Sequence, residues 1–163
     1  MLTVVHINGP INSGKSTLGR ALVDSLLDAS FIDGDDHDAP DDAPLSVRIE
    51  AALRRIEMEI ATRQGRHLVV AYPLDGADYE RLKAASDRRG ARFLVLTLAP
   101  PLEVALTNRG QRALSSEEKR RIVEMYDEGY HARSFSDLVL DTSLLGLSES
   151  LEKARALVLA SAS

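Results

Sequence analysis

Eight consecutive residues near the amino terminus have the types and spacing of a site for phosphate groups. The run Gly9-Pro10-Ile11-Asn12-Ser13-Gly14-Lys15-Ser16 satisfies the pattern G-x-x-x-x-G-K-[ST] at every fixed position. It lies between a short run of strand-forming residues and a stretch with helical spacing, which is the context that this pattern requires. A plain structural turn between a strand and a helix does not need a lysine followed by two hydroxyl residues. The pattern therefore predicts a phosphate-binding loop.

The glycines and backbone amides of this loop have separate roles in holding an anion. Gly9 and Gly14 lack side chains, so they allow the backbone to turn sharply and to approach a ligand closely. The amides from about Asn12 to Ser16 point inward at the start of the following helix, where the helix dipole favours negative charge. We therefore expect the phosphates to be contacted by Gly9, Asn12, Ser13, Gly14, Lys15, Ser16 and Thr17.

Side chains at the end of the loop add a cation and oxygen ligands. The ammonium of Lys15 is expected to reach the β- and γ-phosphates of a nucleoside triphosphate. The hydroxyl of Ser16 is the expected ligand for Mg²⁺, with Thr17 as the alternative. The run Asp33-Gly34-Asp35 follows a predicted strand at 30–33, and the carboxyl ends of parallel strands share one crevice with the loop. These carboxylates belong either to that site or to a solvated Asp-Gly turn.

The elements that must position these residues alternate along the chain. Leu18, Leu22 and Leu26 recur at helical spacing, whereas continuous apolar runs such as Leu94–Leu96 are typical of strands buried on both faces. Alternating strands and helices predict an α/β fold of three layers, α/β/α, with a five-stranded parallel sheet. Strands are expected at 3–7, 30–33, 67–72, 92–98 and 137–140, and helices at 15–29, 44–65, 75–90, from 102 to about 110, at 115–129 and from 148 onward.

Turn and cap residues set the expected ends of these helices. Gly65 fits the end of the second helix. Asp75 is expected to cap the third helix, and Ser115 with Glu118 three residues later forms a capping box. Ser148 is expected to cap the terminal helix. The second helix should bury a face made of Leu45, Ile49, Leu53, Ile56 and Ile60.

Length and composition restrict the function classes. The 163 residues suit a single domain spanning 1–163, and 44% of them are apolar, as in ordinary globular proteins. A net charge of −5 argues against a nucleic-acid or anionic-membrane partner. The chain has no cysteine, which excludes thiol catalysis and disulfides. Because no long apolar run or signal peptide is evident, we expect a cytoplasmic protein without a membrane partner.

With these residues in place, the sequence resembles the Walker A, P-loop family of nucleoside-triphosphate proteins. Its size and order of elements are similar to those of the small-molecule kinases in that family, which include the shikimate, gluconate and adenylylsulfate kinases. The resemblance covers nearly the whole chain, but only the loop at 9–16 is highly specific. It implies the P-loop fold with sheet order 2-3-1-4-5, ATP and Mg²⁺ as cosubstrate and cofactor, and a small hydroxyl-bearing acceptor.

The resemblance also implies roles for individual side chains. Asp35 would accept or orient the proton of the acceptor hydroxyl, and Asp33 would hold Mg²⁺ through water. In a lid at about 109–130, Arg109 would flank the adenine and Arg112 would reach the γ-phosphate as a catalytic residue, although the reverse division is open. Both arginines are alternatively helix-end cations. The loop at 141–143 would lie beside the adenine or would serve only as a turn and cap.

The sequence departs from the family pattern at the end of the third strand. Many P-loop proteins carry an aspartate there, whereas this strand ends at Ala71-Tyr72, so either Asp33 or Asp75 would supply the metal contact. Tyr72 either lines the acceptor pocket or packs at its rim. Other charged residues are interpreted as solvent-facing: Asp38, Asp41, Asp42, Arg48, Arg120 and Arg121.

Two functions follow from this reading. The first is a kinase that moves the γ-phosphate of ATP to a hydroxyl of a small metabolite or an antibiotic-like molecule. The second is a nucleotide-binding switch or regulatory module with little or no kinase activity. The sequence leaves open the acceptor, the preference for ATP over GTP, and the oligomeric state.

Overall fold

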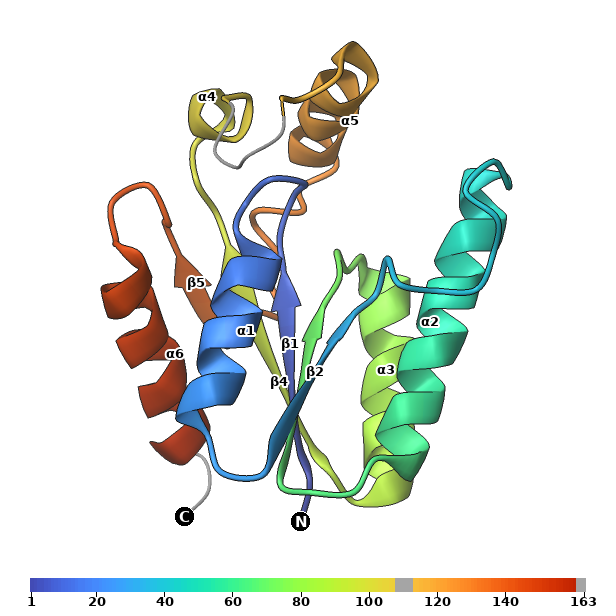
Figure 1. Cartoon of the computed structure of the whole chain (residues 1–163), viewed down its shortest axis with the longest axis vertical. Coiled ribbons are helices and arrows are strands. Elements are labelled where there is room, and N and C mark those ends of the chain that lie inside the picture. The colour runs from blue at the N-terminus through green and yellow to red at the C-terminus, as the bar shows by residue number, and fades with distance from the viewer. Residues whose placement is uncertain (108–112, 161–163) are drawn as a thin grey trace.

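The chain builds one five-stranded sheet, shown in Figure 1. The computed structural model describes residues 1–107 and 113–160. All neighbouring strands pair in parallel in the order β2-β3-β1-β4-β5, so that Thr3 lies opposite both His67 and Arg92. This confirms the predicted α/β sheet and its order. The strands are β1 (Thr3–Asn8), β2 (Ala29–Asp33), β3 (His67–Ala71), β4 (Arg92–Leu98) and β5 (Leu138–Leu140).

Helices cover both faces of the sheet and one of its ends. Helices α1 and α6 pack together on one face, and α2 and α3 pack together on the other (Figure 1). Helices α4 and α5 lie beyond the carboxyl ends of the strands. Within the two described ranges, no helix is long and apolar enough to cross a membrane. The helices are α1 (Lys15–Ser25), α2 (Leu45–Thr62), α3 (Gly76–Arg89), α4 (Leu102–Ala105), α5 (Ser116–Asp127) and α6 (Leu147–Ala160).

The alternation of side chains along the strands divides the core in two. Val4 and Val70 belong to the cluster under α2 and α3, whereas Val5 and Val69 belong to the cluster under α1 and α6. All four are fully buried, because a central parallel strand is covered on both faces. Each such side chain contributes about 1.5–3 kcal/mol of burial free energy. This rigid double core fixes the strand ends at which the candidate site lies.

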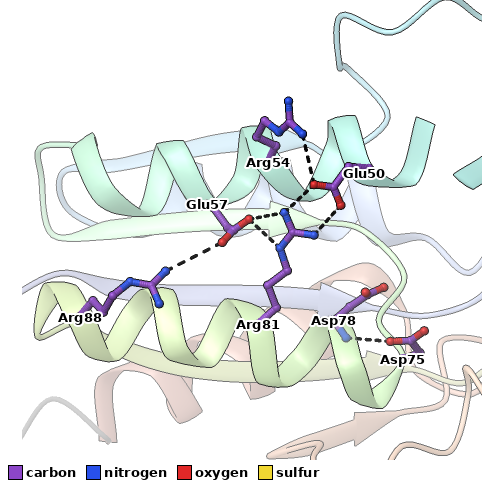
Figure 2. A network of polar contacts seen from close by, with 7 residues as sticks. All are labelled: Glu50, Arg54, Glu57, Asp75, Asp78, Arg81 and Arg88. Atoms are coloured by element: carbon purple, nitrogen blue, oxygen red, sulfur yellow. Dashed lines mark hydrogen bonds and ion pairs between the residues drawn. The ribbon is translucent and has the colours of Figure 1, made fainter. Parts of the chain in front are cut away.

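An ion-pair network holds α2 against α3 (Figure 2). Arg81 of α3 donates through both terminal nitrogens to Glu50 of α2, at 2.7 and 3.0 Å, and through Nε to Glu57 at 2.6 Å. Arg54 and Arg88 extend the network at its edges. Exposed pairs contribute little individually, but a guanidinium shared by two carboxylates fixes orientation. The network therefore sets how the amino-terminal ends of α2 and α3 face each other.

The predicted caps of α3 and α5 are confirmed. Asp75 accepts a hydrogen bond from the amide of Asp78 at 2.8 Å, as an N-cap does. Ser115 and Glu118 exchange two hydrogen bonds, of 3.1 and 3.2 Å, and form the expected capping box. Two helix starts beside the strand ends are thus fixed by side chains that were identifiable in the sequence.

Three predictions about helix ends and faces are wrong in detail. Ser148 does not cap α6, because the helix begins at Leu147 and the amide of Ser150 donates to the Gly146 carbonyl, which places Ser148 inside the first turn. Helix α2 ends at Thr62, before Gly65, whose φ of 111° serves the turn into β3. Leu45 is 49% exposed, because the first turn of α2 extends past the sheet that buries the rest of its apolar face.

Candidate active site

The loop between β1 and α1 has the backbone of an anion site. Gly14 takes the N-cap position of α1 with φ 102°, a conformation that glycine adopts without strain. Within the residues that the structure describes, no side chain caps α1 and no acidic residue lies in its first turn, so the amides at the helix start are available to an external anion. A Cβ on Gly9 would lie 2.6 Å from the Ser13 hydroxyl oxygen and 2.9 Å from the Leu98 carbonyl oxygen. The chain therefore requires glycine at both fixed positions.

Lys15 lies over this loop in a partly dehydrated environment. Its ammonium donates a hydrogen bond to the Pro10 carbonyl at 2.7 Å and so stays folded against the loop. Burial lowers the pKa of Lys15 to about 8, although the carboxylates of Asp35 and Asp33 oppose that fall. The group is consequently still cationic at neutral pH, and its incomplete hydration strengthens its attraction for a phosphate.

Ser16 and Asp33 form a direct contact between the loop and the end of β2. The Ser16 hydroxyl donates to one carboxylate oxygen of Asp33 at 2.9 Å, and the other oxygen accepts from the amide of Asp35 at 3.0 Å. Arg55 of α2 donates to the Asp33 carbonyl at 2.8 Å and fixes the backbone there. This arrangement presents a hydroxyl and a carboxylate oxygen at one point.

That pair of oxygens suits Mg²⁺, which prefers oxygen ligands and usually binds through one or two carboxylates together with phosphates and water. No group of three histidine or acidic side chains within residues 1–107 and 113–160 forms a ready-made metal cage. Of the two aspartates predicted for the metal contact, Asp33 lies beside Ser16, whereas Asp75 accepts the capping bond of α3. The geometry thus favours Asp33.

A cavity of about 780 Å³ opens beside the loop and joins the predicted residues. Lys15, Ser16, Asp33 and Asp35 all line it. Asp35 is exposed overall, but its carboxyl group loses part of its hydration at the cavity wall, which raises its pKa. The negative charge of Asp33 raises that pKa further. Lys15, His37 and Arg48 act in the opposite direction. The cavity therefore brings the Lys15 ammonium and a carboxylate of raised pKa together.

Tyr72 lies in the wall of the same cavity. Its side chain is only 8% exposed, and no residue in the described part of the chain hydrogen-bonds to its hydroxyl. Burial raises the pKa of this phenol, and the charges of Asp35 and Asp78 raise it further. On β1, His6 donates from Nε2 to the Tyr72 carbonyl at 2.7 Å. Burial lowers the pKa of His6 to about 4, so its ring is neutral at neutral pH. Tyr72 both packs at the rim and lines the pocket.

A second cavity of about 180 Å³ lies on the other side of the loop. Thr17 and Leu145 contribute to its walls, and Thr142 donates from its hydroxyl to the Ser13 carbonyl at 3.1 Å. The predicted loop at 141–143 is also a turn, since the Ser143 amide donates to the Asp141 carboxylate at 2.9 Å. The turn interpretation of this loop is confirmed, whereas a position beside the adenine stays a prediction.

Two asparagines tie the loop to distant segments. The side chain of Asn12, at φ 65°, donates to the carbonyls of Ala105 and Thr107, both at 2.8 Å. The buried amide of Asn8 donates to Thr97 and to the Tyr130 carbonyl at 3.1 Å each, and its oxygen accepts from the Leu74 amide at 2.7 Å. Together the two asparagines hold β4, the turn after β3, the residues just before the predicted lid and the last residue of that lid. Asn12 was predicted only as a phosphate contact, and Asn8 was not predicted.

Several charged residues interpreted as solvent-facing line the larger cavity instead. Arg48, Arg121 and Asp41 belong to its wall, as does Asp78, which the sequence analysis did not select. Arg121 was identifiable by its spacing, because it shares one face of α5 with Glu118 and the buried Met125. The lid arginines Arg109 and Arg112 lie outside the described residues, and their roles stay predictions.

Comparison with known proteins gives similarity in structure alone. No protein-family model and no curated protein sequence matches the chain. The gluconokinase from Sinorhizobium meliloti 1021 has a TM-score of 0.74 at 18% identity, covering 94% of this chain and 90% of that protein. The APS kinase of Mycobacterium tuberculosis, solved with AMPPNP and APS, has a TM-score of 0.65 at 20% identity, covering 96% and 97%.

The tunicamycin resistance protein of Deinococcus radiodurans is similar at a TM-score of 0.64 and 22% identity, over 97% of this chain and 96% of that protein. At identities this low the likeness concerns the fold rather than the substrate. The sheet order, the glycine-rich loop after β1 and these neighbours agree. The chain therefore has the fold of the P-loop kinases, which confirms the resemblance inferred from its sequence.

Proposed function

We propose that the protein is an ATP-dependent phosphotransferase that moves the γ-phosphate to a hydroxyl group of a small molecule. One observation carries this proposal: a single cavity is lined by Lys15, by the hydrogen-bonded pair Ser16 and Asp33, and by Asp35. A site that only binds nucleotide does not need a basic carboxylate or a cavity extending beyond the phosphates. The kinase fold of the neighbours supports the same activity.

The proposed nucleotide position follows from the two cavities. The triphosphate lies on the uncapped start of α1, where Lys15 exchanges the Pro10 carbonyl for phosphate oxygens. The base lies toward the smaller cavity, beside Thr142 and Leu145. Ser16 and Asp33 would hold Mg²⁺, which would neutralise charge on the phosphates. The family resemblance implies that Arg109 would flank the adenine and that Arg112 would reach the γ-phosphate, and both residues lie outside the described ranges.

The proposed reaction is a direct transfer. The acceptor oxygen forms a bond to the γ-phosphorus while the bond from that phosphorus to the β–γ bridging oxygen breaks, and ADP leaves with the bonding pair. The acceptor proton passes to the carboxylate of Asp35. The raised pKa of Asp35 improves it as a proton acceptor, while Lys15 and Arg48 favour its ionised form. Lys15 stabilises the charge that develops on the transferring group.

The alternative function, a nucleotide-binding switch, is favoured by the absence of an acidic residue at Ala71-Tyr72, where β3 ends. The contact between Ser16 and Asp33 weakens this argument, because a neighbouring strand supplies the carboxylate. The two functions differ in one observable quantity, which is phosphate in an acceptor product.

The test is transfer of labelled γ-phosphate from ATP to a panel of sugars, sugar acids, nucleosides and aminoglycosides. Asp35→Asn should lower turnover of the best acceptor by about 10²–10⁴-fold while changing ATP affinity little. Asp36→Asn is the matched control, since Asp36 is exposed and does not line the cavity, and it should retain activity. Tight nucleotide binding with no labelled product across the panel would support the switch instead.

A further inference from the structure

The part of the large cavity beyond the phosphate loop is predominantly acidic. Among its described lining residues, carboxylates outnumber the permanently charged cations by six to three. Lys15 and Asp33 are assigned to the nucleotide and its metal, which leaves the excess of negative charge at the acceptor end. The six carboxylates are those of Asp33, Asp35, Asp41, Asp78, Glu117 and Glu118.

The two remaining cations are partly occupied by the protein itself. Arg121 donates to Glu124 at 3.2 Å and to Glu128 at 3.0 Å, both on α5 or at its end. Arg48 uses its Nε to hold the Ala43 carbonyl at 3.0 Å, and its charge acts on Asp35 and on the Tyr72 phenol. An anionic acceptor would therefore meet two partly engaged arginines within a predominantly negative wall.

Asp78 is the carboxylate best placed to meet a cation. It lies in the first turn of α3, and burial together with the neighbouring Asp75 raises its pKa to about 6, so it is mostly ionised at neutral pH. The nearest arginine on its helix, Arg81, turns away to Glu50 and Glu57, as Figure 2 shows. No basic side chain in the described ranges forms an ion pair with Asp78.

The Tyr72 hydroxyl provides a second, independent indication of a polar ligand. Tyr72 lines the large cavity, and no group in the described ranges forms a hydrogen bond with its hydroxyl, which is therefore available to a ligand or to water. The charges that act on this phenol come from Asp35 on one side and from Asp78 on α3. Asp35, Tyr72 and Asp78 therefore lie near one another in the wall of the same cavity.

We infer that the acceptor is a polyhydroxylated molecule bearing an amine. Its reacting hydroxyl lies at Asp35, a neighbouring hydroxyl forms a hydrogen bond with Tyr72, and its ammonium group pairs with Asp78. This inference rests on the proposed function, because it describes the acceptor end of the same site. The inferred acceptor differs from the substrates of sugar-acid kinases. A substrate carboxylate in place of the ammonium would lie directly opposite the carboxylate of Asp78 and be repelled by it.

The test uses three probes that differ only at one carbon: D-glucitol, its 1-amino-1-deoxy derivative and D-gluconate. Their affinities for the full chain are measured by calorimetry at pH 7, with Mg²⁺ and a saturating non-hydrolysable ATP analogue. Binding of that analogue is measured first. We expect the amine to bind about tenfold more tightly than glucitol, and gluconate to bind about tenfold more weakly than glucitol.

Two variants assign the preference to residues. Asp78→Asn should weaken the amine about tenfold while changing glucitol affinity less than twofold. Glu80→Gln, which removes an exposed carboxylate from the same helix, should leave all three affinities unchanged. Tyr72→Phe keeps the packed ring and should weaken glucitol and the amine equally, by about fivefold.

Three outcomes would overturn the inference: gluconate binding as tightly as the amine, an amine preference that survives in Asp78→Asn, or no binding of any probe to the nucleotide-loaded protein. In each of these cases the nucleotide site stands. Failure of the ATP analogue to bind is a different result, because it refutes the proposed function and this inference with it.

Discussion

Replacing Lys15 by methionine should stabilise the nucleotide-free protein and abolish its affinity for nucleotide. The pKa of Lys15 falls from 10.5 to about 8, mainly through burial. A fall of that size corresponds to a penalty of about 3 kcal/mol for keeping the ammonium charged in the folded state. Because Lys15 is partly exposed, we expect about 1–2 kcal/mol of this to be recovered. The Pro10 carbonyl still accepts from the Ser13 amide after the change.

The sign of the pH dependence follows from the direction of the pKa change. The penalty is fully present below pH 8, where the ammonium is charged in both states, and it is relieved as the pH rises from about 8 to 10.5. The advantage of Lys15→Met over the natural protein should therefore shrink between pH 8 and pH 10. At neutral pH the Lys15→Met substitution should raise the melting temperature of the nucleotide-free protein by about 2–8 °C.

The assay is urea denaturation at pH 7 and pH 10, with calorimetry of ATP and ADP binding at pH 7. Lys83→Met is the matched control, because Lys83 is an exposed lysine that pairs with Asp87 on α3. The control should change stability by less than about 0.5 kcal/mol and leave nucleotide affinity intact. A Lys15→Met protein that is less stable than the natural one, or that keeps its ATP affinity, would refute the reasoning.

Three further substitutions test the surroundings of the site by equilibrium denaturation. Gly34→Ala places a Cβ 2.3 Å from the Tyr72 ring and should lower the free energy of unfolding by about 1–3 kcal/mol. An unchanged free energy of unfolding would mean that the ring moves freely. Asn8→Ala removes the acceptor of the buried Leu74 amide and should lower the free energy of unfolding by about 1–3 kcal/mol. A loss below roughly 0.5 kcal/mol, the size expected for a surface change, would argue against a structural role for Asn8. Arg81→Met should cost about 1 kcal/mol at low salt and much less at 1 M salt, and a loss independent of salt would show that packing rather than charge is involved.

The fold and the phosphate loop were predictable because their signals are local. The apolar run of β4 and the glycine spacing at 9–14 each depend on residues close in the chain. The capping box of α5 is likewise contained in four residues. The strand order depends on residues far apart in the chain. It was predicted from the resemblance to a family, and the observed sheet confirms it.

The acceptor end was less predictable, because its residues are adjacent only after folding. Arg48, Asp78 and Arg121 come from three different helices, and each occupies a helix position where a solvated charge would be equally suitable. Whether such a charge faces water or a cavity depends on the tilt of its helix, which the pattern of apolar residues alone does not fix. The same holds for Asn8, whose three partners lie 66 to 122 residues away.

Asn8, just before the glycine-rich loop, and Asn12, within it, restrict where the segment above the site is able to change. Asn12 fixes the chain at Ala105 and Thr107, and Asn8 fixes it again at Tyr130. Insertions or deletions between these attachment points would alter the reach of that segment without displacing the sheet. Under the proposed function, a change in the length of that segment would alter the size of acceptor that the cavity accommodates.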